Sequence, residues 1–390
     1  MSQRLLYLLC WLAAAAMASA AGLDEAPANA WPMFRGCPAG TGRSAAALSL
    51  PLEERWHRAF EKTAFEATPV IADGTIYIGD LDGSFHALAL ATGATTWTFK
   101  SEAGFPSAAA VSTAAALPLV VVGDGDGRVR AFDTATGAVR WEYATDGEIS
   151  GGPTIVHDGT AARVLVGSQD ASLSCLNLAD GTLLWKHSIA DQIRCSPTLA
   201  GGKVFLAGCD GKLHVIDAQT GAAESAVVID GPTGTTPTAH DNRVFFGTEG
   251  GAFYGIDFTA AAVAWKVAPA ANAQSYRSSA ASADGLVIVG SRGRAVEAFS
   301  IADGARTWRQ PMRGRVDGSP VIVRRAEAPG FLALVGDAAG RLVALNVADG
   351  KPVWEFAAGG GFVSSPAVAA DAAVIASVDG TIWCFQSARP

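Results

Sequence analysis

A tryptophan that recurs every 40 to 46 residues is the feature that most constrains the fold of this chain. Eight equivalent positions follow one another, and serine replaces tryptophan at one of them: Trp56, Trp97, Trp141, Trp185, Ser225, Trp265, Trp308 and Trp354. Periods of about 20 to 50 residues are typical of solenoids and β-propellers. The length of 390 residues would otherwise suggest two or three domains. A regular period predicts a single repeating architecture instead.

The residues before each tryptophan predict short antiparallel strands. We interpret a segment such as 85–90 as a strand whose period of two buries one face. A glycine four residues before most of the tryptophans marks a tight turn, because glycine adopts a positive φ at little cost. It is present in six repeats: Gly93, Gly137, Gly181, Gly221, Gly304 and Gly350. Ala261 takes its place in the fifth repeat.

Two further strands joined by a short turn precede this segment, as in residues 68–79. Four strands per repeat, with no helical periodicity after residue 20, predict an all-β fold: an eight-bladed β-propeller of four-stranded antiparallel blades. The tryptophans are expected to dock between adjacent blades, where each ring is buried and its indole N–H donates to backbone.

The last repeat ends after Phe385 without an outer strand of its own. Residues 52–60 carry Trp56 in the matching register, so we expect them to supply that strand and to close the ring with the N-terminal part of the chain. Closure removes sheet edges that would otherwise be open to aggregation. A chain that begins at Leu50 should therefore keep the fold, whereas one that begins at residue 62 should lose cooperativity.

The first residues predict export. Arg4 is followed by an apolar run from Leu5 to Ala18 and then by small residues, which is the layout of a cleavable signal peptide. Cleavage is expected after Ala20, and because Leu9 rather than a small residue precedes Cys10, no lipid anchor is expected. The expected organisation is a signal peptide at 1–20, a leader segment at 21–51 and the propeller at 52–390. We expect a soluble periplasmic or secreted protein with no membrane span.

The net charge of the processed chain restricts the classes of partner that it can bind. Loss of Arg4 with the signal peptide leaves 28 basic and 37 acidic residues, a net charge of −9. Such a surface repels phosphate backbones and anionic lipids. We therefore expect no nucleic-acid partner, and we expect a monomer.

Two segments carry a resemblance to a known family. Residues 133–141, from Asp133 to Trp141, resemble the tryptophan-docking motif of pyrroloquinoline-quinone-type (PQQ-like) propeller repeats, and residues 31–36 (WPMFRG) resemble a leader that precedes the first blade in exported members. Within that group, the chain is nearer in size and blade number to the non-enzymatic BamB-like propellers. The resemblance implies a non-catalytic binding or scaffold protein that engages a protein or peptide-like partner in the cell envelope.

The alternative that the resemblance implies is a quinone-dependent alcohol or sugar dehydrogenase, with PQQ and calcium as cofactors. Alcohol dehydrogenases of that type carry two adjacent cysteines against the cofactor, and no two are adjacent after the signal peptide: Cys37, Cys175, Cys195, Cys209 and Cys384. The repeats are also close to minimum length, which leaves little chain to enclose a cofactor. No Gly-x-Ser-x-Gly elbow or metal-ligand spacing of histidines indicates a hydrolase. We expect no catalytic residues and no cofactor.

One motif resembles the start of a calcium loop. Residues 123–127 (GDGDG) nevertheless align with 79–83 and 336–340 of other repeats, and Arg128 and Arg130 follow where a calcium loop needs further oxygen ligands. We interpret the motif as a turn between strands and expect no metal site.

The cysteines permit one disulfide. Cys195 and Cys209 flank the hairpin around Gly201 and could approach across two strands in an oxidising compartment, although a two-residue turn leaves them one residue out of register. Cys175 and Cys384 occupy equivalent strand positions and are expected to be small buried thiols.

The loops that enter the inner strands provide the candidate site, because they should surround the mouth of the central channel. Turns between second and third strands should add acids there, including Asp80, Asp124 and Asp337. An apolar ring inside an acidic rim with a few arginines is the anatomy of a binding surface. The candidate partner-binding residues are Phe65, Glu66, Phe105, Arg194, Tyr276, Arg277, Arg292, Asp317 and Phe362. The alternative is that the apolar side chains only fill the channel and the acids are solvated turn residues.

Overall fold

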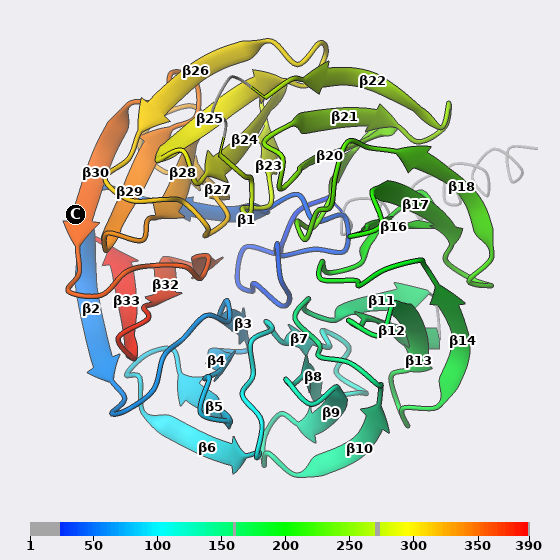
Figure 1. The fold of residues 1–390 in the computed structure, drawn as a ribbon. Coiled ribbons are helices and arrows are strands. Elements are labelled where there is room, and N and C mark those ends of the chain that lie inside the picture. Colours follow the sequence, from blue (N-terminus) through cyan, green and yellow to red (C-terminus); the bar gives the residue numbers. More distant parts are fainter. Residues whose placement is uncertain (1–23, 159–160, 270–273, 389–390) are drawn as a thin grey trace, which may run out of the picture.

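A computed structural model describes residues 24–158, 161–269 and 274–388, so the expected signal peptide lies outside the described part. Eight sheets stand in a ring around a central channel (Figure 1). No helix occurs in the described ranges, and hence none that could cross a membrane. The eight-bladed all-β propeller predicted from the tryptophan period is confirmed.

Seven blades are built from consecutive strands, with the innermost strand first. Blades one to four consist of β3 (Val70–Ala72), β4 (Thr75–Gly79), β5 (Ser84–Ala89) and β6 (Thr95–Lys100); β7 (Ala110–Val111), β8 (Leu119–Gly123), β9 (Arg128–Asp133) and β10 (Val139–Ala144); β11 (Thr154–Asp158), β12 (Ala161–Gly167), β13 (Ser172–Asn177) and β14 (Leu183–Ser188); β15 (Thr198–Ala200), β16 (Lys203–Ala207), β17 (Lys212–Asp217) and β18 (Ala223–Val228).

The remaining blades follow the same order. Blades five to seven consist of β19 (Thr238–His240), β20 (Arg243–Gly247), β21 (Phe253–Asp257) and β22 (Ala262–Val267); β23 (Ala281–Ala283), β24 (Leu286–Ser291), β25 (Ala295–Ser300) and β26 (Arg306–Pro311); β27 (Val321–Arg325), β28 (Phe331–Gly336), β29 (Arg341–Asn346) and β30 (Pro352–Ala357). Blade eight contains β31 (Ala367–Ala369), β32 (Ala372–Ala376) and β33 (Thr381–Ser387).

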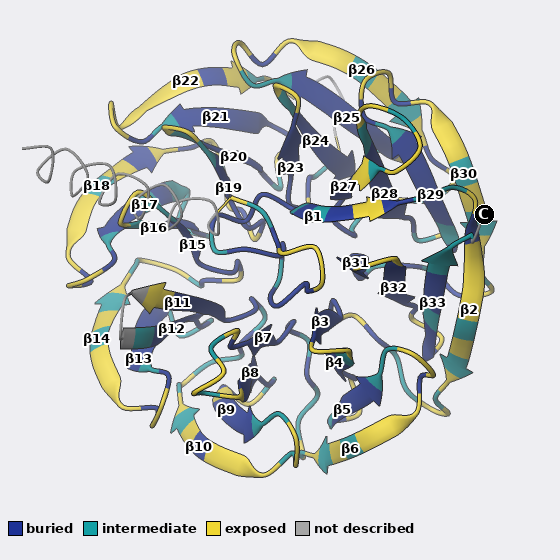
Figure 2. Ribbon diagram, turned by 180° about the vertical axis from the view of Figure 1, so that it is seen from behind, coloured by how far each residue is buried: buried dark blue, intermediate teal, exposed yellow. Residues whose placement is uncertain are grey.

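The N-terminal strand completes blade eight as predicted for residues 52–60. β2 (Leu52–Ala59) runs antiparallel to β33, with Leu52 opposite Ser387 and Ala59 opposite Thr381. Burial follows the radius of the ring, since inner strands are mostly buried, whereas outer strands combine exposed residues with intermediate and a few buried ones (Figure 2). Polar side chains therefore face solvent on the outer strands, whereas adjacent blades share apolar faces.

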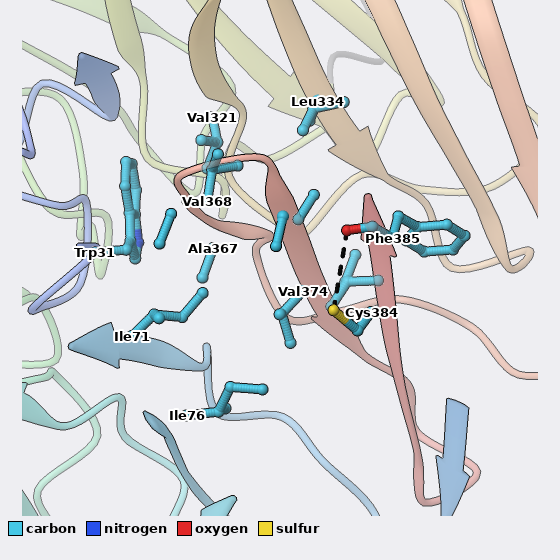
Figure 3. Packing of buried hydrophobic residues seen from close by; sticks show 14 of the residues in the cluster. Trp31, Ile71, Ile76, Val321, Leu334, Ala367, Val368, Val374, Cys384 and Phe385 are labelled. Atoms are coloured by element: carbon cyan, nitrogen blue, oxygen red, sulfur yellow. Dashed lines mark hydrogen bonds between the residues drawn. The ribbon is translucent and has the colours of Figure 1, made fainter. Parts of the chain in front are cut away.

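The leader was not expected to join a sheet, but it does. β1 (Arg43–Leu48) pairs in parallel with β27 and makes blade seven five-stranded. Trp31 is fully buried and packs with Ile71 of β3, Val321 of β27 and Val368 of β31 (Figure 3). An aperiodic segment thus fills part of the channel that the repeats enclose.

Backbone carbonyls of the leader also accept hydrogen bonds from the innermost strands of six blades and from the turn that follows β31 in blade eight. The amides of these blades that donate to it, at 2.6 to 3.0 Å, belong to Ile71, Val111, Leu199, Ala239, Ser282, Ile322 and Ala370. The inner edge of a blade is otherwise an unpaired sheet edge. A chain that begins at Leu50 would lack the segment that satisfies these edges.

The recurring tryptophans lie between neighbouring blades. Six of the seven donate the indole N–H to a backbone carbonyl of the next blade at 2.8 to 3.0 Å, the acceptors being Leu90, Thr134, Leu178, Ile301, Val347 and Leu52. Trp185 differs: its buried indole nitrogen has no partner, and the equivalent carbonyl, that of Ala218, accepts from Arg163 at 3.0 Å.

The turn glycine has a second reason to be glycine. At Gly181, φ is +74° and an added Cβ would lie 2.7 Å from the Trp141 ring of the preceding blade. Ala261 adopts φ 50° at the equivalent turn, where the preceding blade has Ser225 in place of tryptophan. The serine leaves room for the alanine methyl group. Phe258 of the same turn packs instead against Phe205 of blade four, with ring centroids 4.8 Å apart.

Candidate functional site

The candidate site is a funnel on the axis of the ring, at the channel mouth. It has a volume of about 170 Å³, and each blade contributes one residue to its upper ring: Glu66, Pro106, Ser150, Arg194, Gly234, Arg277, Asp317 and Val363. These residues come from the loops that enter the inner strands. The structure therefore brings together four of the sequence-predicted site residues, namely Glu66, Arg194, Arg277 and Asp317.

A second ring below the first forms the wall of the funnel: Thr68, Ala108, Gly152, Ser196, Thr236, Ser279, Ser319 and Ser365. At five junctions, a hydroxyl group of this ring accepts a hydrogen bond from a backbone N–H of the preceding blade. The first of these bonds joins Ser196 N to Thr236 Oγ1 at 3.0 Å, and the last joins Ser365 N to Thr68 Oγ1 at 3.1 Å. The belt is interrupted at Ala108 and Gly152.

The interruption coincides with the leader. Phe34 also lines the funnel, and a Cβ added at Gly152 would lie 3.3 Å from the Phe34 Cβ. Small residues at 108 and 152 thus leave space for this ring. Phe34 was not predicted as a site residue, because the leader has no counterpart in the repeats against which to compare it.

Three of the predicted phenylalanines are not accessible at the channel mouth. Phe65, Phe105 and Phe362 are fully buried. Phe105 packs over the end of β4, where a Cβ added at Gly79 would lie 2.2 Å from its Cβ. These side chains turn outward between blades rather than toward the axis, so they are unavailable to a partner in this conformation. The glycine at the end of the second strand is the signal that could have revealed this.

Tyr276 is also held within the ring. It is 7% exposed, and its hydroxyl donates to Glu297 Oε2 at 2.9 Å. Burial, together with the Glu297 carboxylate, raises the pKa of Tyr276 well above its ordinary value. The phenol therefore stays neutral and its ring edge lines a cavity while its hydroxyl is engaged.

That cavity, of about 290 Å³, adjoins the funnel over blades three to six. It shares Ser150, Arg194, Gly234 and Arg277 with the funnel and adds Glu148, Gln169, Glu249 and Tyr276. Arg277 Nε lies 3.2 Å from Glu249 Oε1. Arg194 donates through Nε and one terminal nitrogen to Gln192 Oε1 at 3.0 and 2.6 Å. The Arg194 guanidinium is exposed and forms an ion pair with no carboxylate in the described ranges.

The other predicted arginine is internally paired. Arg292 donates to both oxygens of Asp317, at 2.8 and 3.1 Å, and Arg315 donates to Asp317 Oδ2 at 2.9 Å. The hydrogen bond with Asp317 raises the pKa of Arg292. Arg315 was missed in the sequence, although it lies only two residues before Asp317 in the same loop. Asp317 and Arg292 thus form a fixed cluster beside the freer Arg194 and Arg277.

Several aspartates of the predicted acidic rim are not exposed to solvent. Asp80, Asp124 and Asp337 are buried and accept amide hydrogen bonds within their own turns; Asp124 Oδ1, for example, accepts from Arg128 N at 2.9 Å. Residues 123–127 accordingly form the turn between β8 and β9. The acids that were expected to form the rim there serve to hold the turns.

The residues present do not fit a calcium–quinone pair. Of the carboxylates in the upper ring, Asp317 is already shared by two arginines, which leaves Glu66 alone. Nowhere in the described ranges do three His, Cys, Asp or Glu side chains gather as a cation would require.

The Cys195–Cys209 disulfide that the sequence permits is not formed in the structure, where both are free thiols. β15 and β16 pair Thr198 with Phe205, a register that sets Gly208 rather than Cys209 opposite Cys195. Burial raises the pKa of Cys195 to about 12, so it remains a thiol. Cys175 and Cys384 are fully buried thiols.

Comparison with solved structures shows the same fold in proteins of different activity. BamB from Moraxella catarrhalis superposes with a TM-score of 0.70 at 19% identity, covering 86% of this chain and 100% of that one. Quinohemoprotein alcohol dehydrogenase from Comamonas testosteroni gives 0.74 at 14% identity, covering 93% and 81%. A europium-containing methanol dehydrogenase gives 0.72 at 13%, covering 92% and 98%. At these identities the likeness extends to the fold alone.

Among curated protein sequences no significant match is found. A family model does match, described as outer membrane protein assembly factor BamB, over residues 51–169, 169–329 and 292–389. These segments include nearly the whole propeller. The repeat period, the closed ring of eight blades and this match together show that the chain belongs to the BamB-like family of PQQ-type propellers.

Proposed function

We propose that the chain is an exported, non-catalytic propeller that binds a protein or peptide-like partner of the cell envelope at its channel mouth. The supporting observation is that Arg194 and Arg277 line the same two adjoining cavities and keep exposed guanidinium groups there. Arginine is enriched among residues that dominate binding energy at protein interfaces. Membership of the BamB-like family supports an envelope protein as the partner.

The nine residues predicted from the sequence now divide into two groups. Arg194, Arg277, Glu66 and Asp317 line the funnel, and Arg292 orients Asp317. Phe65, Phe105, Tyr276 and Phe362 pack between blades and support the loops that carry the first group. We propose that only the first group contacts the partner.

Affinity capture from the native envelope tests this proposal. The Arg194→Ala/Arg277→Ala variant should recover at least about tenfold less of the partner than wild type, because loss of interface anchors typically costs that much affinity. Its melting temperature should stay close to wild type, since both side chains are exposed. A matched control, Arg55→Ala/Arg140→Ala, removes two exposed arginines from outer strands and should recover the partner normally.

If the mouth variant folds normally and recovers the same partners in the same amounts, the mouth is not the binding site. Addition of PQQ with calcium addresses the alternative function. We expect neither a change in absorbance nor dye reduction with an alcohol or sugar, and either response would argue for the dehydrogenase.

Export has its own test. The intact mass of the protein recovered from the envelope should correspond to a chain that begins at Ala21 and carries no lipid. A mass for residues 1–390, or one increased by acyl chains, would contradict the proposed processing.

A further inference from the structure

A buried arginine lies at the centre of the ring, in the leader. Arg35 is 1% exposed and adopts φ 63°. One terminal nitrogen of its guanidinium donates to the Ala280 carbonyl, next to β23, at 2.7 Å. A Cβ added at Gly42 would lie 1.8 Å from that same nitrogen, so the leader closes directly over the side chain. The guanidinium is thus enclosed by the leader on one side and blade six on the other.

Most of the donors of this guanidinium are unused. Nε and the second terminal nitrogen of Arg35 are buried and have no hydrogen-bond partner. The centroid of the Phe34 ring lies 5.9 Å from the guanidinium carbon. A buried donor without an acceptor is costly to leave in a folded protein, so a ligand with acceptor capacity is expected.

The charge of Arg35 is also unbalanced. All 37 acidic residues of the chain fall within the described ranges, yet none of the described carboxylates forms an ion pair with Arg35. The one ionisable group found to influence the pKa of Arg35 is the Cys37 thiol. A buried charge without a counter-charge strongly destabilises a fold.

Cys37 is held in its neutral form. Thr41 Oγ1 donates its single proton to the Asp24 carbonyl at 2.6 Å, because a carbonyl can only accept. The contact of 3.2 Å between Cys37 Sγ and Thr41 Oγ1 therefore needs the thiol proton as donor. Burial further raises the pKa of Cys37. The thiol does not supply the missing negative charge.

We propose that Arg35 binds a chloride-sized inorganic anion inside the channel, between the leader and β23. Water would satisfy the free donors but would leave the charge uncompensated, whereas a monovalent anion does both. A carboxylate of a bound peptide is a poorer candidate, since Arg35 lines neither the funnel nor the adjoining cavity. The anion would fasten the leader to blade six, independently of what binds at the mouth.

A halide titration of the processed protein tests the site. At constant ionic strength, replacement of sodium gluconate by sodium chloride or bromide should raise the melting temperature of wild type by about 1 to 3 °C at a tenfold excess over the dissociation constant. Arg35→Gln should lose this response. Arg277→Gln, which removes a charge from the mouth, should retain it and so controls for general salt effects.

Equal melting temperatures of wild type in gluconate and in both halides would overturn the proposal, as would an unchanged halide response in Arg35→Gln. If Arg35→Gln does not fold, crystals of wild type grown in bromide decide the question. An anomalous peak within hydrogen-bonding distance of Arg35 Nε or its free terminal nitrogen is expected. Water density at that position, with bromide ordered only elsewhere, would refute the site.

Discussion

Two boundaries between blades show different solutions to the same packing problem. Between blades two and three, Trp141 is 7% exposed, its ring lies against Gly181, and its indole donates to the Leu178 carbonyl at 2.8 Å. Between blades four and five, Ser225 offers no ring. Phe258 comes from the opposite side, from blade five, and packs against Phe205 of blade four.

The difference separates two contributions that the tryptophan combines. An aromatic ring packs at both boundaries, from a different blade in each, so we expect the volume to be required and its source to be interchangeable. The indole hydrogen bond is present only at the first. Trp185 at the boundary between blades three and four keeps the ring and lacks the bond. Blade four is therefore the one blade flanked on both sides by boundaries without that hydrogen bond.

The largest effect is expected from Trp141→Ala. Loss of a buried aromatic side chain and the cavity it leaves should reduce the free energy of unfolding by about 3 to 5 kcal/mol. Urea unfolding followed by circular dichroism measures it. Ser225→Ala, the equivalent position without a ring, should change stability by no more than about 0.5 kcal/mol. Similar losses at both positions would mean that the serine is itself a packing element.

Phe258→Ala should come next, with a loss of about 3 kcal/mol, because this ring replaces the tryptophan. A variant that combines Ser225→Trp, Phe258→Ala and Ala261→Gly restores the usual arrangement and should recover at least half of the loss in the same urea assay. No recovery would show that the two arrangements are not interchangeable.

Substitution of the turn residue should reduce stability at Gly181 but have little effect at Ala261. Gly181→Ala places a methyl group against the Trp141 ring at positive φ and should cost about 1 to 3 kcal/mol. Ala261→Gly, at a turn without a facing indole, should stay within about 0.5 kcal/mol of wild type. Thermal melts of the two variants side by side make the comparison, and equal costs would remove the proposed link between the ring and the glycine.

The smallest effect concerns the pH dependence of blade four. Burial lowers the pKa of His214, on β17, below its ordinary value although Asp210 opposes the shift. The unfolded chain therefore binds this proton more readily than the folded one, so stability falls as the pH drops through about 6.5. Between about pH 7.5 and 5.5, His214→Gln should show a smaller fall in melting temperature than wild type. His57→Gln, at an exposed position on β2, should behave as wild type.

Features that repeat could be predicted from the sequence, because each position is seen several times. The tryptophan period, the turn glycines and the last strand supplied by residues 52–60 all follow from alignment of the repeats with one another. The same alignment located Arg194 and Arg277 at the mouth. Periodicity alone was enough for these features.

Features without a repeat could not be found in this way. Trp31, Phe34 and Arg35 of the leader make contacts with distant blades that no local pattern encodes. Alignment placed Phe65, Phe105 and Phe362 in the correct loops but not their direction, because an irregular loop lacks the alternation that fixes inward and outward faces of a strand.

The route of the leader has a consequence for the order of folding. Residues 26–48 lie along the inner strands, and the chain then continues into the outer strand of the last blade, with Ser49 N bonded to Ser387 Oγ at 2.9 Å and Trp354 bonded to Leu52. Contacts between residues far apart in the sequence slow folding, because the chain must lose loop-closure entropy before these contacts can form and stabilise it. β2 can therefore pair only after the strands of the last blade have been synthesised. Until that blade arrives, β2 lacks the strand with which it pairs, and the interval is one in which other chains can compete for it.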